Sequence, residues 1–107
     1  MTAIQRVEIK VDGGPVPAYL SVPAEVGTHP GILVLCEIFG VNENIKNVCM
    51  RLADQGYVAM ALDPFHREEQ PVSPFDRPEI GLEKRARLKD VHLIAEMRGA
   101  VEYLKKT

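Results

Sequence analysis

The fold is decided by Gly31-Ile32-Leu33-Val34-Leu35-Cys36, an uninterrupted apolar run with the length of a β-strand. A run without polar alternation is typical of a strand that is buried on both faces of a parallel sheet. A second run of the same kind follows as Tyr57-Val58-Ala59-Met60-Ala61-Leu62. Together the two runs predict a sheet that contains parallel strands.

The sequence between these strands predicts a helix. Asn42 is suited to cap its first turn, and Gly56 is a residue type that commonly ends a helix. Apolar residues recur at helical spacing on one face, namely Ile45, Val48, Cys49, Leu52 and Ala53. A strand, a helix and a strand within about 30 residues form a βαβ unit, whose crossover is expected to be right-handed.

The sequence before this unit predicts a β-hairpin. Residues 4–11 alternate between apolar and polar side chains, as a half-buried strand does. Asp12-Gly13-Gly14 is a hairpin turn signal, and residues 16–22 form the predicted returning strand.

The sequence after the unit predicts a loop and then helix. Residues 63–78 contain four prolines and form a long irregular loop. From Glu79 the pattern is helical to the end of the chain, with a second helix starting near Asp90. Its predicted apolar stripe consists of Val91, Ile94, Ala95, Val101 and Leu104. The fold class is therefore α/β, with an N-terminal β-hairpin, a βαβ unit and a C-terminal helix.

Composition excludes several classes of partner. The chain has 107 residues, enough for one domain, and 13 Lys and Arg against 15 Asp and Glu give a net charge of -2. Without a basic excess, neither nucleic acid nor an anionic membrane surface is an expected partner. No apolar run is long enough to span a bilayer. Two cysteines suit a reducing compartment, so a cytoplasmic location is expected.

The sequence contains no pattern for a metal or cofactor. Cys36 and Cys49 lie in apolar segments and are expected to pack in the core. His66 lies near Asp63 and near Glu68-Glu69, but the chain has no spaced His and Cys set of the kind that zinc needs. No glycine-rich phosphate loop or dinucleotide fingerprint is present. We therefore expect no metal and no cofactor.

Charged residues are concentrated at residues 83–89, before the second C-terminal helix. The run Glu83-Lys84-Arg85-Ala86-Arg87-Leu88-Lys89 contains one acidic and four basic side chains. Such a run is expected to form a solvated helix face.

The segment Leu35-Cys36-Glu37-Ile38-Phe39-Gly40-Val41-Asn42 resembles the first active-site turn of the dienelactone hydrolase family, a branch of the α/β-hydrolases. Residues 54–59, 63–67 and 99–104 are similar to further segments of that family. The resemblance covers essentially residues 1–107, but only about the first half of the family's chain. It implies the spatial strand order 1-2-4-3, with Ile32–Cys36 at one edge of the sheet.

The resemblance also implies a chemistry. In this family a Cys–His–Asp triad cleaves an ester or lactone, and the nucleophile lies in a Gly-x-Cys-x-Gly elbow. Neither Cys36 nor Cys49 lies between glycines, and Ser21 and Ser73 lack the elbow pattern as well. We therefore expect no nucleophile within these residues, and no hydrolysis by this chain alone.

Two site residues follow from the resemblance. Glu37 matches the family glutamate that contacts the resting thiol, and the backbone N–H of Ile38 matches one of two oxyanion-hole donors. Some members hold a substrate carboxylate with an arginine beyond the proline-rich loop. Arg77, Arg85 and Arg87 lie in that region, and none is assigned from the sequence.

Two hypotheses about function remain. The chain is either the N-terminal part of a dienelactone hydrolase-like carboxylic ester hydrolase, or a non-catalytic half-domain that acts as a dimerisation or interaction module. An open apolar edge strand is a template for aggregation. In both cases the Ile32–Cys36 edge is expected to be covered, by a second copy or by a C-terminal hydrolase fragment. A small-molecule ester is a substrate only for the completed site.

Overall fold

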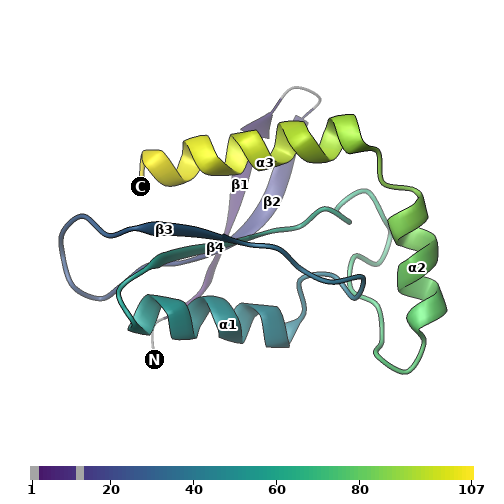
Figure 1. Cartoon of the computed structure of the whole chain (residues 1–107), viewed down its shortest axis with the longest axis horizontal. Helices are drawn as coiled ribbons and strands as arrows, with labels where there is room; N and C mark the ends of the chain where they lie inside the picture. Colours follow the sequence, from purple (N-terminus) through teal and green to yellow (C-terminus); the bar gives the residue numbers. More distant parts are fainter. Residues whose placement is uncertain (1–2, 12–13) are drawn as a thin grey trace.

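A computed structural model describes residues 3–11 and 14–107. In it, α1 and α3 cover opposite faces of one four-stranded sheet, and α2 lies beyond the carboxyl ends of β3 and β4 (Figure 1). The elements are β1 (Gln5–Val11), β2 (Gly14–Ser21), β3 (Gly31–Val34), α1 (Glu43–Asp54), β4 (Val58–Leu62), α2 (Pro78–Ala86) and α3 (Asp90–Lys105). The predicted α/β class, with a hairpin, a βαβ unit and a C-terminal helix, is confirmed.

The strand order of the sheet is β1-β2-β4-β3. β1 pairs with β2 and β2 with β4 in antiparallel fashion, whereas β3 and β4 are parallel. This order confirms the expected 1-2-4-3 arrangement and places β3 at an edge. The predicted hairpin is present, although Asp12 and Gly13 of its expected turn lie outside the described residues.

Local signals placed the helix ends correctly. The Asn42 side chain accepts a hydrogen bond from the Ile45 N–H at 3.1 Å and so caps α1. Gly56 follows the last cap residue of α1 with a φ of +99°, which glycine adopts at little cost. The break between α2 and α3 falls just before Asp90, as predicted.

The two apolar runs differ in burial. All five residues of β4 are buried, as predicted for a strand covered on both faces. Val58, Met60 and Leu62 belong to the core cluster beneath α3, and Ala59 and Ala61 to the cluster beneath α1. This alternation explains why the strand has no polar face.

For residues 31–36 the expectation of burial on both faces was wrong. β3 ends at Val34, its last three residues are only half-buried, and Leu35 is 57% exposed. The reason is position: an edge strand has one neighbour, so its free side and its end meet solvent. Cys36, expected in the core, is half-buried against the cluster beneath α1, whereas Cys49 is fully buried as predicted.

The predicted apolar stripe of α3 was largely wrong. Val91, Ile94 and Val101 are exposed, whereas Glu96 and Ala100 are buried. The sheet lies under a different face of the helix from the one that the apolar spacing indicated. None of the helices among residues 3–11 and 14–107 is long and apolar enough to cross a bilayer.

The charged run at residues 83–89 was expected to be solvated throughout, and Lys84 contradicts this. Its side chain is 7% exposed, because Nζ turns inward to donate to the Ser73 hydroxyl at 2.7 Å and to the Gln70 carbonyl.

Candidate active site

The carboxyl ends of β3 and β4 open into the two loops that carry the predicted site residues. In open α/β sheets, ligands bind at the carboxyl ends of the strands. A pocket of about 230 Å³ lies here, and its lining includes Cys36, Glu37 and Ile38 after β3 and Phe65 after β4. Leu93 and Met97 of α3 contribute apolar side chains. The structure therefore brings both site residues expected from the sequence, Glu37 and Ile38, to one pocket.

A tight turn shapes the loop after β3. The Gly40 N–H donates to the Glu37 carbonyl at 3.1 Å, and Gly40 has a φ of +82°. Ile38 and Phe39 are the central residues of this turn. The Phe39 carbonyl accepts from the Ser73 N–H at 2.9 Å. The Ile38 N–H donates to no group among residues 3–11 and 14–107.

Cys36 lines the pocket but lacks the properties of a nucleophile. Burial raises the pKa of its thiol to about 12, and the negative charges of Asp63 and then Glu37 act in the same direction. Only the thiolate is an effective nucleophile. At neutral pH this thiol is therefore protonated.

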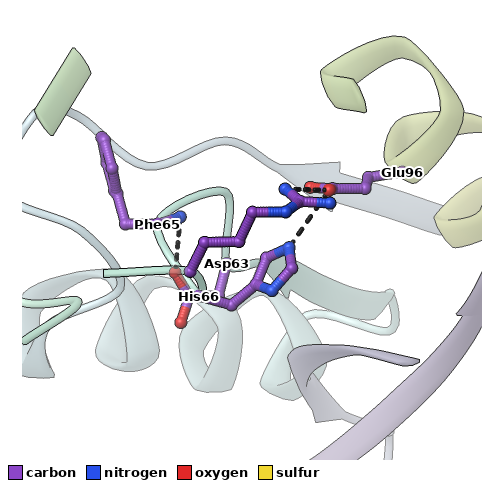
Figure 2. Close-up of polar contacts among 5 residues, drawn as sticks. Asp63, Phe65, His66 and Glu96 are labelled. Carbon is purple, nitrogen blue, oxygen red and sulfur yellow. Dashed lines mark hydrogen bonds and ion pairs between the residues drawn. The ribbon is translucent and has the colours of Figure 1, made fainter. Parts of the chain in front are cut away.

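A charge network centred on the buried Glu96 carboxylate, with Arg67 47% exposed, holds the loop after β4 (Figure 2). The Glu96 side chain of α3 is 2% exposed. Its Oε2 atom is hydrogen-bonded to His66 Nε2 at 3.1 Å and to Arg67 Nη1 at 2.8 Å. Asp63 is also buried and accepts from the Phe65 N–H at 3.0 Å. Because Phe65 lines the pocket, this network positions part of the pocket wall.

Sequence reasoning missed Glu96 in this network. It set His66 beside Asp63, Glu68 and Glu69, whereas the partner of His66 lies 30 residues away on α3. The one sequence signal for this contact was the position of the Glu96 carboxylate within an amphipathic helix. Within the described residues, no three His, Cys, Asp or Glu side chains gather as metal ligands.

The three arginines left unassigned have different environments. Arg77 is exposed and pairs with Glu79 at 2.5 Å, and Arg87 makes two bonds to Glu68 at 2.7 and 2.9 Å. Arg85 lines the pocket and, among the described residues, makes no salt bridge. Of the three, Arg85 alone has its charge available at the candidate site.

Asp63 supports a prediction about pH. Burial is the largest cause of the raised pKa of its carboxyl, so the folded state disfavours the charged form. We expect Asp63→Asn, which keeps an acceptor for the Phe65 N–H, to raise the melting temperature by a few degrees at pH 7. A raised pKa contributes stability that is present at low pH and lost as the pH rises, so the variant's advantage should shrink as the pH falls towards 3.8. Thermal unfolding of both proteins between pH 4 and 8 measures this, and a constant difference would contradict it.

A mixed sheet whose site lies at the carboxyl ends of its parallel strands is the architecture of an α/β-hydrolase. The model of the dienelactone hydrolase family matches residues 16–107. The chain belongs to the dienelactone hydrolase family.

Two relatives share the name "Putative carboxymethylenebutenolidase". The one from Methylorubrum extorquens is 39% identical over 102 residues, which are 95% of this chain and 35% of the relative. The one from Escherichia coli (strain K12) is 36% identical over 90 residues, 83% of this chain and 33% of the relative. The chain therefore spans about a third of the length of these relatives.

Solved structures show the same fold. The "Putative Dienelactone Hydrolase from Klebsiella pneumoniae subsp. pneumoniae MGH 78578" superposes with a TM-score of 0.86 at 29% identity, over 99% of this chain and 45% of that one. A dienelactone hydrolase-like promiscuous phosphotriesterase from metagenomic libraries gives a TM-score of 0.73 at 23% identity, over 97% of this chain and 43% of that one.

Proposed function

We propose that residues 1–107 form the N-terminal part of a carboxylic ester or lactone hydrolase whose nucleophile is supplied from outside them. One observation carries this proposal. The turn at residues 37–40 presents an Ile38 N–H that has no acceptor among the described residues, beside a pocket at the carboxyl ends of the parallel strands. The resemblance assigns that N–H to the oxyanion hole, and family membership supports the assignment.

The proposed mechanism gives this chain two roles. When the nucleophile attacks the ester carbonyl, negative charge develops on the carbonyl oxygen, and the Ile38 N–H donates to it. Glu37, exposed at the pocket and without an ion pair among the described residues, contacts the resting thiol before the substrate binds. A carboxylate close to a thiol disfavours the thiolate, which limits its reactivity in the resting enzyme. We propose a cytoplasmic location for this activity, because both cysteines are free, as is usual in a reducing compartment.

Hydrolysis of an activated ester such as 4-nitrophenyl acetate tests the proposal. We expect the purified 107-residue chain to show no activity above buffer, and activity to require the polypeptide that carries the nucleophile elbow. In the active assembly, Cys36→Ala should leave the rate unchanged, whereas Glu37→Ala should alter its pH profile. Hydrolysis by the chain alone that Cys36→Ala abolishes would overturn the proposal.

Arg85 leads to a prediction about substrate charge. Its guanidinium is the cation in the lining of an otherwise largely apolar pocket. A charge-assisted hydrogen bond contributes about 1.5–3 kcal/mol. In the active assembly, Arg85→Leu is therefore expected to raise KM for an ester that carries a carboxylate by about tenfold or more. KM for a neutral ester of the same size should stay unchanged, and Arg51→Leu on the surface of α1 provides the control variant. Equal effects on both esters would contradict the prediction.

A second candidate function is an interaction module, and an exposed apolar groove favours it. The groove, about 440 Å³, lies between β3 and α3 and is lined by Leu33, Ile94, Met97 and Val101 among others. β3 also has an unpaired edge in the described sheet. We propose that in an interaction module this groove and edge receive a second copy of the chain, whereas in the hydrolase they receive a C-terminal hydrolase fragment.

Native mass spectrometry separates these occupants. A species that contains this chain and a different polypeptide supports the hydrolase, and a homodimer supports the interaction module. Ile94→Asp places a charge in the groove and is expected to weaken either association at least tenfold, because a buried unpaired carboxylate is costly. Val26→Asp, at a fully exposed loop position, is the matched control. A wild-type chain that is monomeric without any partner would count against both occupants.

A further inference from the structure

The turn at residues 37–40 is held from outside by the proline-rich segment that follows β4. Ser73, 2% exposed, donates its N–H to the Phe39 carbonyl at 2.9 Å. The Phe75 and Phe39 rings are in contact, with centroids 4.7 Å apart. Gly40 approaches the Pro71 carbonyl so closely that a Cβ would not fit between them. The position of the turn therefore depends on the position of residues 71–75.

Residues 71–75 form no strand or helix themselves, and Lys84 of α2 anchors them. The Lys84 ammonium donates to the Ser73 hydroxyl at 2.7 Å and to the Gln70 carbonyl. Lys84 makes no salt bridge in the part of the chain that the structure describes. Its buried charge thus acts on two oxygens of the segment, and charge-assisted bonds of this kind are stronger than neutral ones.

The helix that carries Lys84 also contacts the turn directly. A Cβ at Gly81 would lie 2.5 Å from the Ile38 carbonyl oxygen, so the backbone of α2 is in close contact with the turn. Gly81 and Lys84 are three residues apart and therefore share one face of α2. Ser73 connects α2 to the turn, because its hydroxyl accepts a hydrogen bond from Lys84 while its N–H donates to the Phe39 carbonyl.

We propose that Lys84 is a positioning residue for the oxyanion-hole donor, acting through Ser73 and the turn at residues 37–40. An oxyanion donor stabilises the transition state only when its direction is fixed before the reaction. Lys84 fixes the segment, the segment fixes Phe39 and Gly40, and these two residues follow Ile38 in the same turn. We call the contacts that run from Lys84 through Ser73 to Phe39 the clamp. The inference rests on the proposed function, since it gives the clamp a role in the same site.

Amide hydrogen exchange, followed by NMR on the purified protein with any chain that accompanies it, tests the clamp without using activity. In Lys84→Met, the Gly40 and Ser73 amides are expected to exchange about tenfold faster or more, while the amides of β4 stay unchanged. Lys84→Arg keeps a charged donor and should restore slow exchange. Lys106→Met, at an exposed position of the chain's last turn, is the matched control.

Kinetics in the active assembly then test the catalytic consequence. Lys84→Met should lower kcat about tenfold with KM little changed, and Lys84→Arg should recover most of the loss. If Lys84→Met does not fold, Ser73→Ala removes the hydroxyl acceptor alone and should show the same two effects in weaker form. Unchanged exchange at Gly40 and Ser73, or faster exchange with an unchanged kcat, would overturn the inference. A wild-type assembly without hydrolysis would instead refute the proposed function, while the exchange result would still decide whether the clamp exists.

Discussion

Gly40→Ala is expected to lower the free energy of unfolding by about 3 kcal/mol or more and to displace the active-site turn. Two costs combine at this position. A φ of +82° is unfavourable for any residue with a Cβ, by about 1–2 kcal/mol. The new Cβ would also overlap the backbone carbonyl oxygen of Pro71, which cannot rotate away as a side chain would. Urea unfolding of both proteins measures the loss.

Gly56→Ala provides the matched control. Gly56 has a comparable φ of +99°, but nothing lies within 4 Å of the position that a Cβ would take. Its substitution should therefore show the conformational cost alone, about 1–2 kcal/mol. If the two substitutions cost the same, the close approach of Gly40 to Pro71 contributes nothing. Loss of the Phe39 and Ser73 contact in Gly40→Ala alone would support the role of that approach.

The predictions that held depend on local interactions. The Asn42 cap, the Gly56 stop and the boundary at Asp90 are set by residues within one turn of the helix end. The five buried residues of β4 are apolar because the strand has a helix on each face. The spacing of residues within one element is therefore enough to predict helix ends and a strand that is covered on both faces.

The predictions that were wrong depend on distant parts of the chain. Apolar character in residues 31–36 did not reveal that β3 has one neighbour, and the spacing of Ile94 and Val101 did not reveal which face of α3 meets the sheet. The charge pattern around Lys84 predicts a solvated side chain, because its acceptors, Gln70 and Ser73, lie on another segment. Burial is a property of tertiary packing, and periodicity within one element reports it only indirectly.

The residues of the candidate site also separate into those with a local sequence signal and those without one. Glu37 and Ile38 were selected because they form part of a recognisable string of residues, and both line the pocket. Their roles in catalysis stay predictions that the structure does not test. The side chains that hold the pocket wall, above all Glu96, have no local signature, because each acts on a residue that is remote in sequence.

Arg67→Ala should be among the most destabilising substitutions of a charged residue in this protein. Arg67 donates at 2.8 Å to the carboxylate of Glu96, of which 2% is exposed, so its removal leaves a buried charge with His66 as its remaining partner. Removing one member of a fully buried pair costs about 3–5 kcal/mol. Because the Arg67 side chain is 47% exposed and the His66 contact is retained, the expected loss is smaller, about 1–2 kcal/mol. Arg77→Ala, which removes an exposed pair with Glu79, is the control and should leave the melting temperature unchanged.

A double variant identifies the cause of this loss. If the cost arises from the unpaired Glu96 carboxylate, replacing that carboxylate with an apolar side chain should remove most of it. Arg67→Ala combined with Glu96→Leu is therefore expected to be more stable than Arg67→Ala alone, although it carries one more substitution. Additive losses would show instead that Arg67 acts through the packing of its own side chain. Phe65 precedes Arg67 by two residues, donates its N–H to Asp63 and lines the pocket. The same comparison therefore indicates whether charge or packing positions the pocket wall.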